Sequence, residues 1–444
     1  MKLLAAAALL TVWLTGTPVS AQVGSPAGPV PPDRLAARRA ALLDSIGTGI
    51  AVLRSATQRS VEGDYPQDGD YRERNDFFYL TGLEAPEAWL VLVARESGAD
   101  ETILYLPARN DRAERWTGPR LGPGKEAAAL TAIADIRPAD SAAAEVRRLV
   151  LASGSPARAG GVYLPADRAR QPAAQFDGVI TASDTGAAGV RVKSLNRETA
   201  ALRLVKDAED LRRLRKAIEI TGASITEALQ AIEPGKMEYE IEAVIEFGFR
   251  RRGAERVGFP SIVGAGENST ILHYDRSRGR LEAGDLVVMD VGAEWGYHSA
   301  DITRTAPVSG RFTRRQRELY DLVLATQQAA IDSARPGATV GDLNRIAREY
   351  MKAHSGSLCG EVTCDTYWIH GLSHWLGMDV HDVGDYRTPL LPGMVLTIEP
   401  GIYIPAERIG IRIEDDVLVT SGEPELLSAG VPRTAAEIER AMSP

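Results

Sequence analysis

Four carboxylates and one imidazole in the second half of this 444-residue chain constrain its fold more than any other feature. They lie in three separate segments, and the four acids fall at or beside the ends of apolar, strand-like runs. Acidic groups that share a site disfavour each other's ionisation unless a counter-charge is near. Four carboxylates carry about the charge that two dications neutralise, and oxygen ligands with one nitrogen suit Mn²⁺ or Zn²⁺. These residues are Asp290, Asp301, His374, Glu399 and Glu414.

The first two acids are expected to face each other across a β-hairpin. The runs LVVMD and DITRT are strand-like, with a turn around Trp295-Gly296. A hairpin centred there pairs Asp290 with Asp301, so both carboxylates point to the same face of the sheet. Trp-Gly is a weaker hairpin signal than Asn-Gly or Asp-Gly. A metal would supply the counter-charge that this pair of acids needs.

The other two acidic ligands also lie on or at the end of strand-like runs, and the imidazole ligand lies in a cluster of histidines. Arg412 and Glu414 alternate with isoleucines, so they share one face of a strand, and the arginine is placed to orient a ligating carboxylate. Glu399 ends the run VLTIE before Pro400-Gly401 breaks the strand. All six histidines lie between residues 273 and 381, and three fall within HGLSHWLGMDVHD. Beside so many acids, this cluster favours a metal centre over packing histidines.

Composition indicates an ordinary globular protein with more than one domain. The length favours two domains, and 44% hydrophobic with 25% charged residues is typical of globular chains. The net charge of −9 disfavours binding to a phosphate backbone, so no nucleic-acid partner is expected. A small charged or peptidic partner fits this composition better.

The N-terminal residues have the pattern of a secretory signal peptide. Lys2 precedes an apolar run from Leu3 to Leu14, and the small residues Val19-Ser20-Ala21 predict cleavage before Gln22. The run is too short to span a bilayer comfortably; a buried N-terminal helix and a retained anchor are the alternatives. Export to the periplasm or the exterior is therefore expected, without membrane attachment after cleavage. Export favours a disulfide between the two cysteines, Cys359 and Cys364.

The order of helical and strand-like runs predicts two domains. In the first half, alternating helices and strands indicate an α/β domain with a mixed sheet, with an Ala-rich helix over residues 126–153. In the second half, long helices and short strands indicate an α+β arrangement, an antiparallel sheet with helices on one side. The expected divisions are a signal at 1–21, a disordered lead-in at 22–34, and domains at 35–198 and 199–444.

These strings resemble the aminopeptidase P family, the Xaa-Pro aminopeptidases of the pita-bread metallopeptidases. The resemblance covers most of residues 35–440 and is strongest in IVGAGENSTILHY, DVGAEWGYHSADITRT, HGLSHWLGMDVHDVG, EPGIYI and GIRIEDDVLVT. It implies an α+β fold with a C-terminal pita-bread catalytic domain, preceded by a smaller α/β, creatinase-like domain. It also implies a homo-oligomer, either a dimer or a tetramer.

The resemblance further implies a ligand scheme for two divalent ions, Mn²⁺ before Zn²⁺ or Co²⁺. Asp301 and Glu414 would bridge both ions, Asp290 would complete one shell, and His374 and Glu399 would complete the other. The resemblance assigns catalytic and supporting positions to Glu399, His370, His381, His273 and Arg412. It assigns substrate-binding positions to Tyr403 and Trp116. Trp116 would come from the N-terminal domain of the same or a neighbouring subunit.

The implied reaction removes the first residue of peptides that carry proline in second position. A hydroxide bridging the two ions would attack the Xaa-Pro bond, and Glu399 would carry the proton to the leaving nitrogen. One alternative is a prolidase, which cleaves only Xaa-Pro dipeptides. The other is a non-catalytic binding protein of the same fold, although such relatives generally lose ligands and this chain keeps all five.

Overall fold

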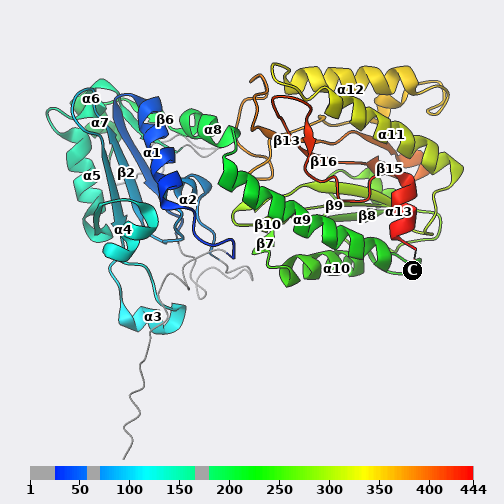
Figure 1. Ribbon diagram of the computed structural model, residues 1–444, viewed down its shortest axis with the longest axis horizontal. Helices are drawn as coiled ribbons and strands as arrows, with labels where there is room; N and C mark the ends of the chain where they lie inside the picture. The colour runs from blue at the N-terminus through cyan, green and yellow to red at the C-terminus, as the bar shows by residue number, and fades with distance from the viewer. Residues whose placement is uncertain (1–25, 58–70, 166–179, 444) are drawn as a thin grey trace, which may run out of the picture.

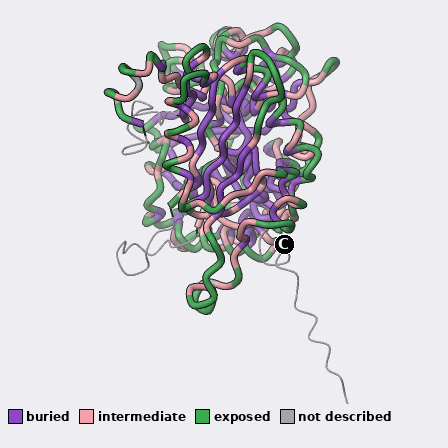
Figure 2. Tube along the Cα trace, turned by 90° about the vertical axis from the view of Figure 1, so that its left-hand side faces the viewer, coloured by how far each residue is buried: buried purple, intermediate pink, exposed green. Residues whose placement is uncertain are grey.

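The computed structural model describes residues 26–57, 71–165 and 180–443. The expected signal at 1–21 and the first residues of the lead-in lie outside the described residues. Two bodies of mixed helix and strand lie side by side (Figure 1). Buried strands run through the middle of the molecule and exposed segments cover its outside (Figure 2). Every described helix is too short or too polar to cross a membrane.

The N-terminal domain is built on a six-stranded mixed sheet in the order β4-β3-β2-β1-β5-β6, which confirms the expected mixed sheet. β1 pairs antiparallel with β2 and parallel with β5. Alternate side chains of the strands enter opposite faces: Leu53 and Leu92 pack beneath α1 (Pro32–Ile46) and α2 (Asn75–Thr81), whereas Val52 and Val91 pack against α5 (Ala142–Leu151). The strands are β1 Gly49–Arg54, β2 Trp89–Ala94, β3 Glu101–Leu106, β4 Asp135–Pro138, β5 Val162–Leu164 and β6 Val192–Ser194.

Helices cover both faces of this sheet, and α3 projects away from it (Figure 1). They are α1 Pro32–Ile46, α2 Asn75–Thr81, α3 Asp111–Thr117, α4 Lys125–Thr131, α5 Ala142–Leu151, α6 Pro156–Ala159 and α7 Ala182–Ala188.

Two expectations for this half were wrong. The Ala-rich stretch 126–153 is not one helix, because β4 runs between α4 and α5 and ends at Pro138, whose ring cannot continue a helix. The described end of the lead-in is ordered rather than disordered. Val30 is 2% exposed in the core, and α1 begins with Pro32 at its first turn, where proline is favoured.

The C-terminal domain has mixed helix and strand content, as expected, and all its strand pairs are antiparallel. The strands fall into four small sheets instead of one: β11-β10-β7, β12-β9-β8, β13-β16-β17 and β14-β15. They are β7 Arg256–Val257, β8 Ile262–Ala265, β9 Leu286–Val291, β10 Ala293–Trp295, β11 His298–Ser299, β12 Ile302–Pro307, β13 Val395–Ile398, β14 Gly401–Ile404, β15 Ile409–Arg412, β16 Asp415–Leu418 and β17 Glu425–Leu426.

The helices of this domain pack as two pairs rather than as one layer. α9 and α10 contact each other and the strands β8, β10 and β11. α11 and α12 contact each other, and α11 packs on β13, β14 and β15, on the other side of the strands in Figure 1. The helices are α8 Asn196–Leu204, which joins the two domains, α9 Ala208–Ala231, α10 Glu238–Arg251, α11 Arg314–Asp332, α12 Val340–His354 and α13 Ala435–Ala441.

The hairpin register differs from the expected one by two residues. Asp290 pairs with Thr303, not with Asp301, and the two-residue turn is Gly296-Tyr297. Both turn residues have positive φ, 60° and 67°, which is the type I′ geometry that fits the strand twist. Because the shift is an even number of residues, Asp301 remains on the face of Asp290. The expected consequence, two carboxylates on one side of the hairpin, therefore holds.

Candidate metal centre

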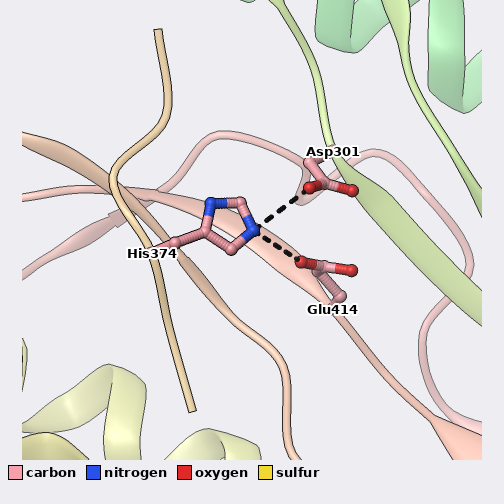
Figure 3. A group of neighbouring side chains, drawn as sticks. All are labelled: Asp301, His374 and Glu414. Atoms are coloured by element: carbon pink, nitrogen blue, oxygen red, sulfur yellow. Dashed lines mark ion pairs between the residues drawn. The ribbon is translucent and has the colours of Figure 1, made fainter. Parts of the chain in front are cut away.

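Three side chains from distant segments converge at the centre of the C-terminal domain. Asp301 follows β11, His374 precedes β13, and Glu414 lies between β15 and β16. Their ligand atoms all lie within 4.8 Å of one another. His374 Nε2 is 3.3 Å from Asp301 Oδ2 and 3.8 Å from Glu414 Oε1, and the three groups point toward one another (Figure 3). All three residues are buried, so this is an enclosed cluster of donors rather than a surface patch.

The other two expected ligands border the same cavity, which has a volume of about 460 Å³. Glu399 Oε1 lies 3.5 Å from His374 Nε2. Asp290 Oδ2 accepts a hydrogen bond of 2.6 Å from Arg412 Nη2, and its carboxyl group interacts with that of Asp301. The structure thus brings all five sequence-predicted ligands around one space.

Hydrogen bonds hold these donors in place. The Nδ1–H of His374 faces the Trp375 carbonyl at 3.1 Å, which leaves the Nε2 lone pair toward the acids. Thr303 donates to Glu414 Oε2 at 2.6 Å, and Thr397 donates to Glu399 Oε1 at 3.4 Å. We did not predict either threonine, although the pattern could have found them. Each lies two residues from an expected ligand on a strand-like run, and therefore on the same face.

The acids carry a surplus of negative charge that a cation would offset. Burial, followed by repulsion from neighbouring carboxylates, raises the pKa of Asp301 and of Glu414 well above the usual range. Burial also raises the pKa of Glu399 to about 7, although His374 and Arg412 oppose the rise. Oδ1 of Asp290 and Oδ1 of Asp301 are buried and find no donor among the described residues. Free carboxylate oxygens beside one imidazole fit divalent cations.

These raised pKa values predict how pH changes stability and metal uptake. A folded-state pKa above the unfolded value, which is about 4 for these acids, means that folding stability is lost as pH rises. For Glu399 this loss runs from about pH 4 to about pH 7 in the metal-free protein. Metal binding displaces the protons, so a divalent ion should raise the unfolding temperature more at pH 8 than at pH 5.5. Thermal unfolding with and without Mn²⁺, at matched ionic strength, measures this; equal gains at both pH values would contradict it.

A hydrogen-bonded chain fixes His370 at the edge of the cavity. Arg412 Nη1 donates to the Tyr403 hydroxyl at 2.9 Å, and that hydroxyl lies 2.8 Å from His370 Nε2. His370 Nδ1 faces the Gly371 carbonyl at 2.7 Å, so Nδ1 carries the proton and Nε2 accepts from the tyrosine. Burial, with the positive charge of Arg412, lowers the pKa of His370 to about 4, which keeps the ring neutral near pH 7. Its Nδ1 is also 3.6 Å from Glu399 Oε2.

The other predicted site residues occupy different places. His381 lines the cavity, with its ring edge-on to His374 at 4.3 Å between centroids. His273 is exposed at the rim, and Arg412 lines the wall. Tyr403 is buried and does not border the cavity, so in this structure it supports His370 rather than facing the space where a substrate would lie.

The structure does not bring Trp116 into this cavity. Its side chain is 87% exposed on the projecting helix α3.

The predicted disulfide is confirmed: Cys359 and Cys364 are bonded in the segment before His370. We did not predict Arg348 of α12, which donates to the His370 carbonyl at 2.9 Å and anchors the same segment.

Family models match both halves of the chain. The model of metallopeptidase family M24 matches residues 212–421, and that of the N-terminal domain of aminopeptidase P matches residues 35–155. A Xaa-Pro aminopeptidase of Escherichia coli K12 is 36% identical over 91% of this chain and 96% of its own length. The mitochondrial intermediate cleaving peptidase 55 of Arabidopsis thaliana is 32% identical over 88% of this chain and 78% of its own length.

Solved structures agree with these matches. Proline aminopeptidase P II from Yersinia pestis superimposes with a TM-score of 0.81 at 35% identity, over 93% of this chain and 99% of that one. Zinc-substituted E. coli aminopeptidase P, solved in complex with product, gives a TM-score of 0.83 at 32% identity, over 94% and 99% of the two chains.

Proposed function

This chain belongs to the aminopeptidase P family within the M24 metallopeptidases, and we propose that it removes the N-terminal residue from peptides with proline in second position. Its C-terminal domain is of the pita-bread type and follows an aminopeptidase P N-terminal domain. The single observation that carries the proposal is the meeting of all five expected ligands around one cavity of about 460 Å³. We also place the domain boundary at residues 198 and 199, within α8.

The donor set supports two divalent cations, with Mn²⁺ as the first choice and Zn²⁺ or Co²⁺ as alternatives. We infer that Asp301 would contribute to holding both of them, because it faces His374 at 3.3 Å and also interacts with the Asp290 carboxyl group. Glu414 supports the same role through its interactions with His374, Asp301 and Asp290. Such cations, when bound, depress the pKa of water and polarise a neighbouring carbonyl.

The chain's own residues would position the substrate and move the proton. Glu399 is placed to accept a proton from water and deliver it to the leaving nitrogen, since its carboxylate borders the cavity. His381 is placed to hold the carbonyl oxygen as negative charge develops on it. His370, which we expected to share this role, borders the same cavity, but both its ring nitrogens are used by the Gly371 carbonyl and the Tyr403 hydroxyl, so it would have to exchange one of these bonds to do so. Asp290 would hold the free α-amine of the peptide, which limits removal to one residue. Apolar side chains complete the wall, namely Phe259, Pro260, Ile262, Leu272 and Val380.

A small peptide panel tests the activity. We expect the metal-loaded protein to hydrolyse Ala-Pro-Leu, and to cleave Ala-Ala-Leu at least about 100-fold more slowly, because an apolar wall would hold the pyrrolidine ring but would leave the N–H of a secondary amide without a partner. Ala-Pro is the matched dipeptide, and cleavage of it alone would make the protein a prolidase. Metal binding with no hydrolysis of any of the three would favour the non-catalytic binding protein.

We also propose that the protein is exported and acts in the periplasm or outside the cell. The signal-like residues 1–21 and the Cys359–Cys364 disulfide support this, because disulfides persist in oxidising compartments. Recovery of the protein only from the cytoplasm, with its N-terminus intact, would contradict export.

The exposed Trp116 on the projecting α3 supports a dimer or tetramer, which light scattering would measure.

A further inference from the structure

The loop that carries His381 is held from outside the catalytic domain. It runs from Trp375, the residue after His374, to Asp382, the residue after His381. The carbonyl of Met378, near its tip, accepts hydrogen bonds from Arg72 Nη2 at 3.1 Å and from Asn75 Nδ2 at 3.3 Å. Both donors belong to the N-terminal domain, just before and at the start of α2.

One buried guanidinium joins the same two parts of the chain. Arg203, near the end of α8, is 4% exposed. Its Nη1 donates to Asp76 Oδ1 of α2 at 2.8 Å, and its Nη2 donates to Asp379 Oδ2 at 3.0 Å and to Asp382 Oδ1. Lys206 completes the arrangement by donating to Asp382 Oδ2 at 3.0 Å. Carboxylates on both sides of His381 are thus tied to a carboxylate of the N-terminal domain.

The loop itself is tight and depends on these contacts. The amide of Asp382 donates to the Trp375 carbonyl at 2.9 Å, and the amide of Gly377 donates to the Asp379 carbonyl at 3.2 Å. A β-carbon at Gly377 would lie only 2.1 Å from Asp382 Oδ2, so the carboxylate fills the space inside the turn. A shift of Asp382 would therefore move the backbone next to His381.

The hairpin that leads to Asp301 is held by the same domain. Arg72 Nε lies 2.9 Å from Glu294 Oε2 of β10. Tyr297, in the turn, stacks on Phe78 of α2 with 3.8 Å between ring centroids. Two segments that carry site residues thus rest on one small region of the N-terminal domain.

We propose that Asn75, Asp76 and Arg203 are positioning residues for the reaction: they hold the loop Trp375–Asp382 and so aim His381 at the substrate carbonyl. The N-terminal domain then completes the catalytic site of its own chain. This inference rests on the proposed Xaa-Pro aminopeptidase activity and deepens it. Charge-assisted contacts around the buried guanidinium of Arg203, above all the one with the buried Asp382, are strong enough to fix such a loop.

A double-mutant cycle tests this inference with Asp76→Asn, which keeps the shape of the side chain and removes the charge that faces Arg203. We expect kcat on Ala-Pro-Leu to fall about tenfold with KM changed less than about twofold, as misplacement of a group that acts in the transition state predicts. In a His381→Ala background the same substitution should cost less than about twofold, because the positioned group is gone. Asn75→Ala should give a smaller loss of the same kind and leaves the charged network intact.

Glu145→Gln is the matched control. Glu145 is a half-buried acid of the same domain that contacts Arg137 and Tyr105 and lies away from the loop, so its loss should leave kcat unchanged. Hydrogen exchange gives a readout that does not need activity: Asp76→Asn should speed exchange at the amides of Gly377 and Asp382. Equal losses of kcat in both backgrounds, or unchanged exchange, would overturn the positioning role. An inactive wild-type protein would instead overturn the proposed function, and the exchange result would still decide this inference.

Discussion

Asp301→Asn is expected to lower kcat/KM on Ala-Pro-Leu by at least about 1,000-fold and to remove most of the stabilisation that Mn²⁺ confers. Loss of a group that merely orients a ligand costs about 10- to 100-fold, and Asp301 is itself at the centre, 3.3 Å from His374. An amide supplies one neutral oxygen where the carboxylate supplies two charged ones. The measurements are steady-state kinetics and thermal unfolding with and without Mn²⁺.

This loss should not come from unfolding. Asp301 is a buried carboxylate whose pKa is raised by burial and by Asp290, so its charge destabilises the metal-free protein at pH 8. The metal-free variant should therefore unfold at the same temperature as the wild type, or higher. Asp285→Asn is the matched control, because Asp285 directly precedes β9 as Asp301 directly precedes its partner strand β12, and Asp285 pairs with Arg408 outside the cavity. An active Asp301→Asn variant that still binds Mn²⁺ would contradict the ligand scheme.

The four acidic ligands could be found from the sequence because each lies on or beside a short strand with a clear pattern, whereas His374 was indicated by the clustering of histidines. Alternation placed Arg412 and Glu414 on one face, and both border the cavity. The hairpin was also foreseeable, but its register was not. The turn uses Tyr297 at φ 67°, a conformation that a non-glycine residue adopts only when the surroundings enforce it. That residue is held between the domains by its stacking on Phe78, which is a contact between distant parts of the sequence.

The residues that support the site were harder to find, because they act through folded contacts. Arg304 is fully buried and forms an ion pair with Asp415, which also accepts a hydrogen bond from Ser428. Nothing in the sequence around Arg304 or Ser428 indicates that these two residues would meet at Asp415. Asp416 accepts the Asp301 amide, although the string EDD gave a visible signal of excess acid beside Glu414. Local patterns can therefore indicate the ligands, whereas the partners that fix their orientation depend on the tertiary structure.

The Ala-rich stretch shows that tertiary contacts also decide secondary structure that local sequence does not reveal. Composition over residues 126–153 favours a helix. The structure instead has the strand β4 there, at the edge of the sheet. It pairs in parallel with β3, with Ile136 opposite Leu104. A four-residue strand next to a proline carries little signal of its own, and tertiary pairing overrides propensity.

Glu399→Gln is expected to lower kcat about 1,000-fold, within the range for a group that transfers a proton in the transition state. Glutamine keeps the length and the oxygen that faces His374, but it cannot accept a proton from water. KM should change little, because the substrate would still be held by the other residues of the wall.

The concentration of metal separates the two roles of Glu399, since it is also an expected ligand. If Glu399 moves the proton, the loss in kcat should persist when Mn²⁺ saturates the variant. If the activity returns as Mn²⁺ is raised, Glu399 only holds metal and another group must carry the proton. Glu407→Gln is the control: Glu407 lies just after β14 at the surface, paired with Arg315, and its change should leave kcat within about twofold. A persistent loss confined to Glu399 would assign proton transfer to this carboxylate.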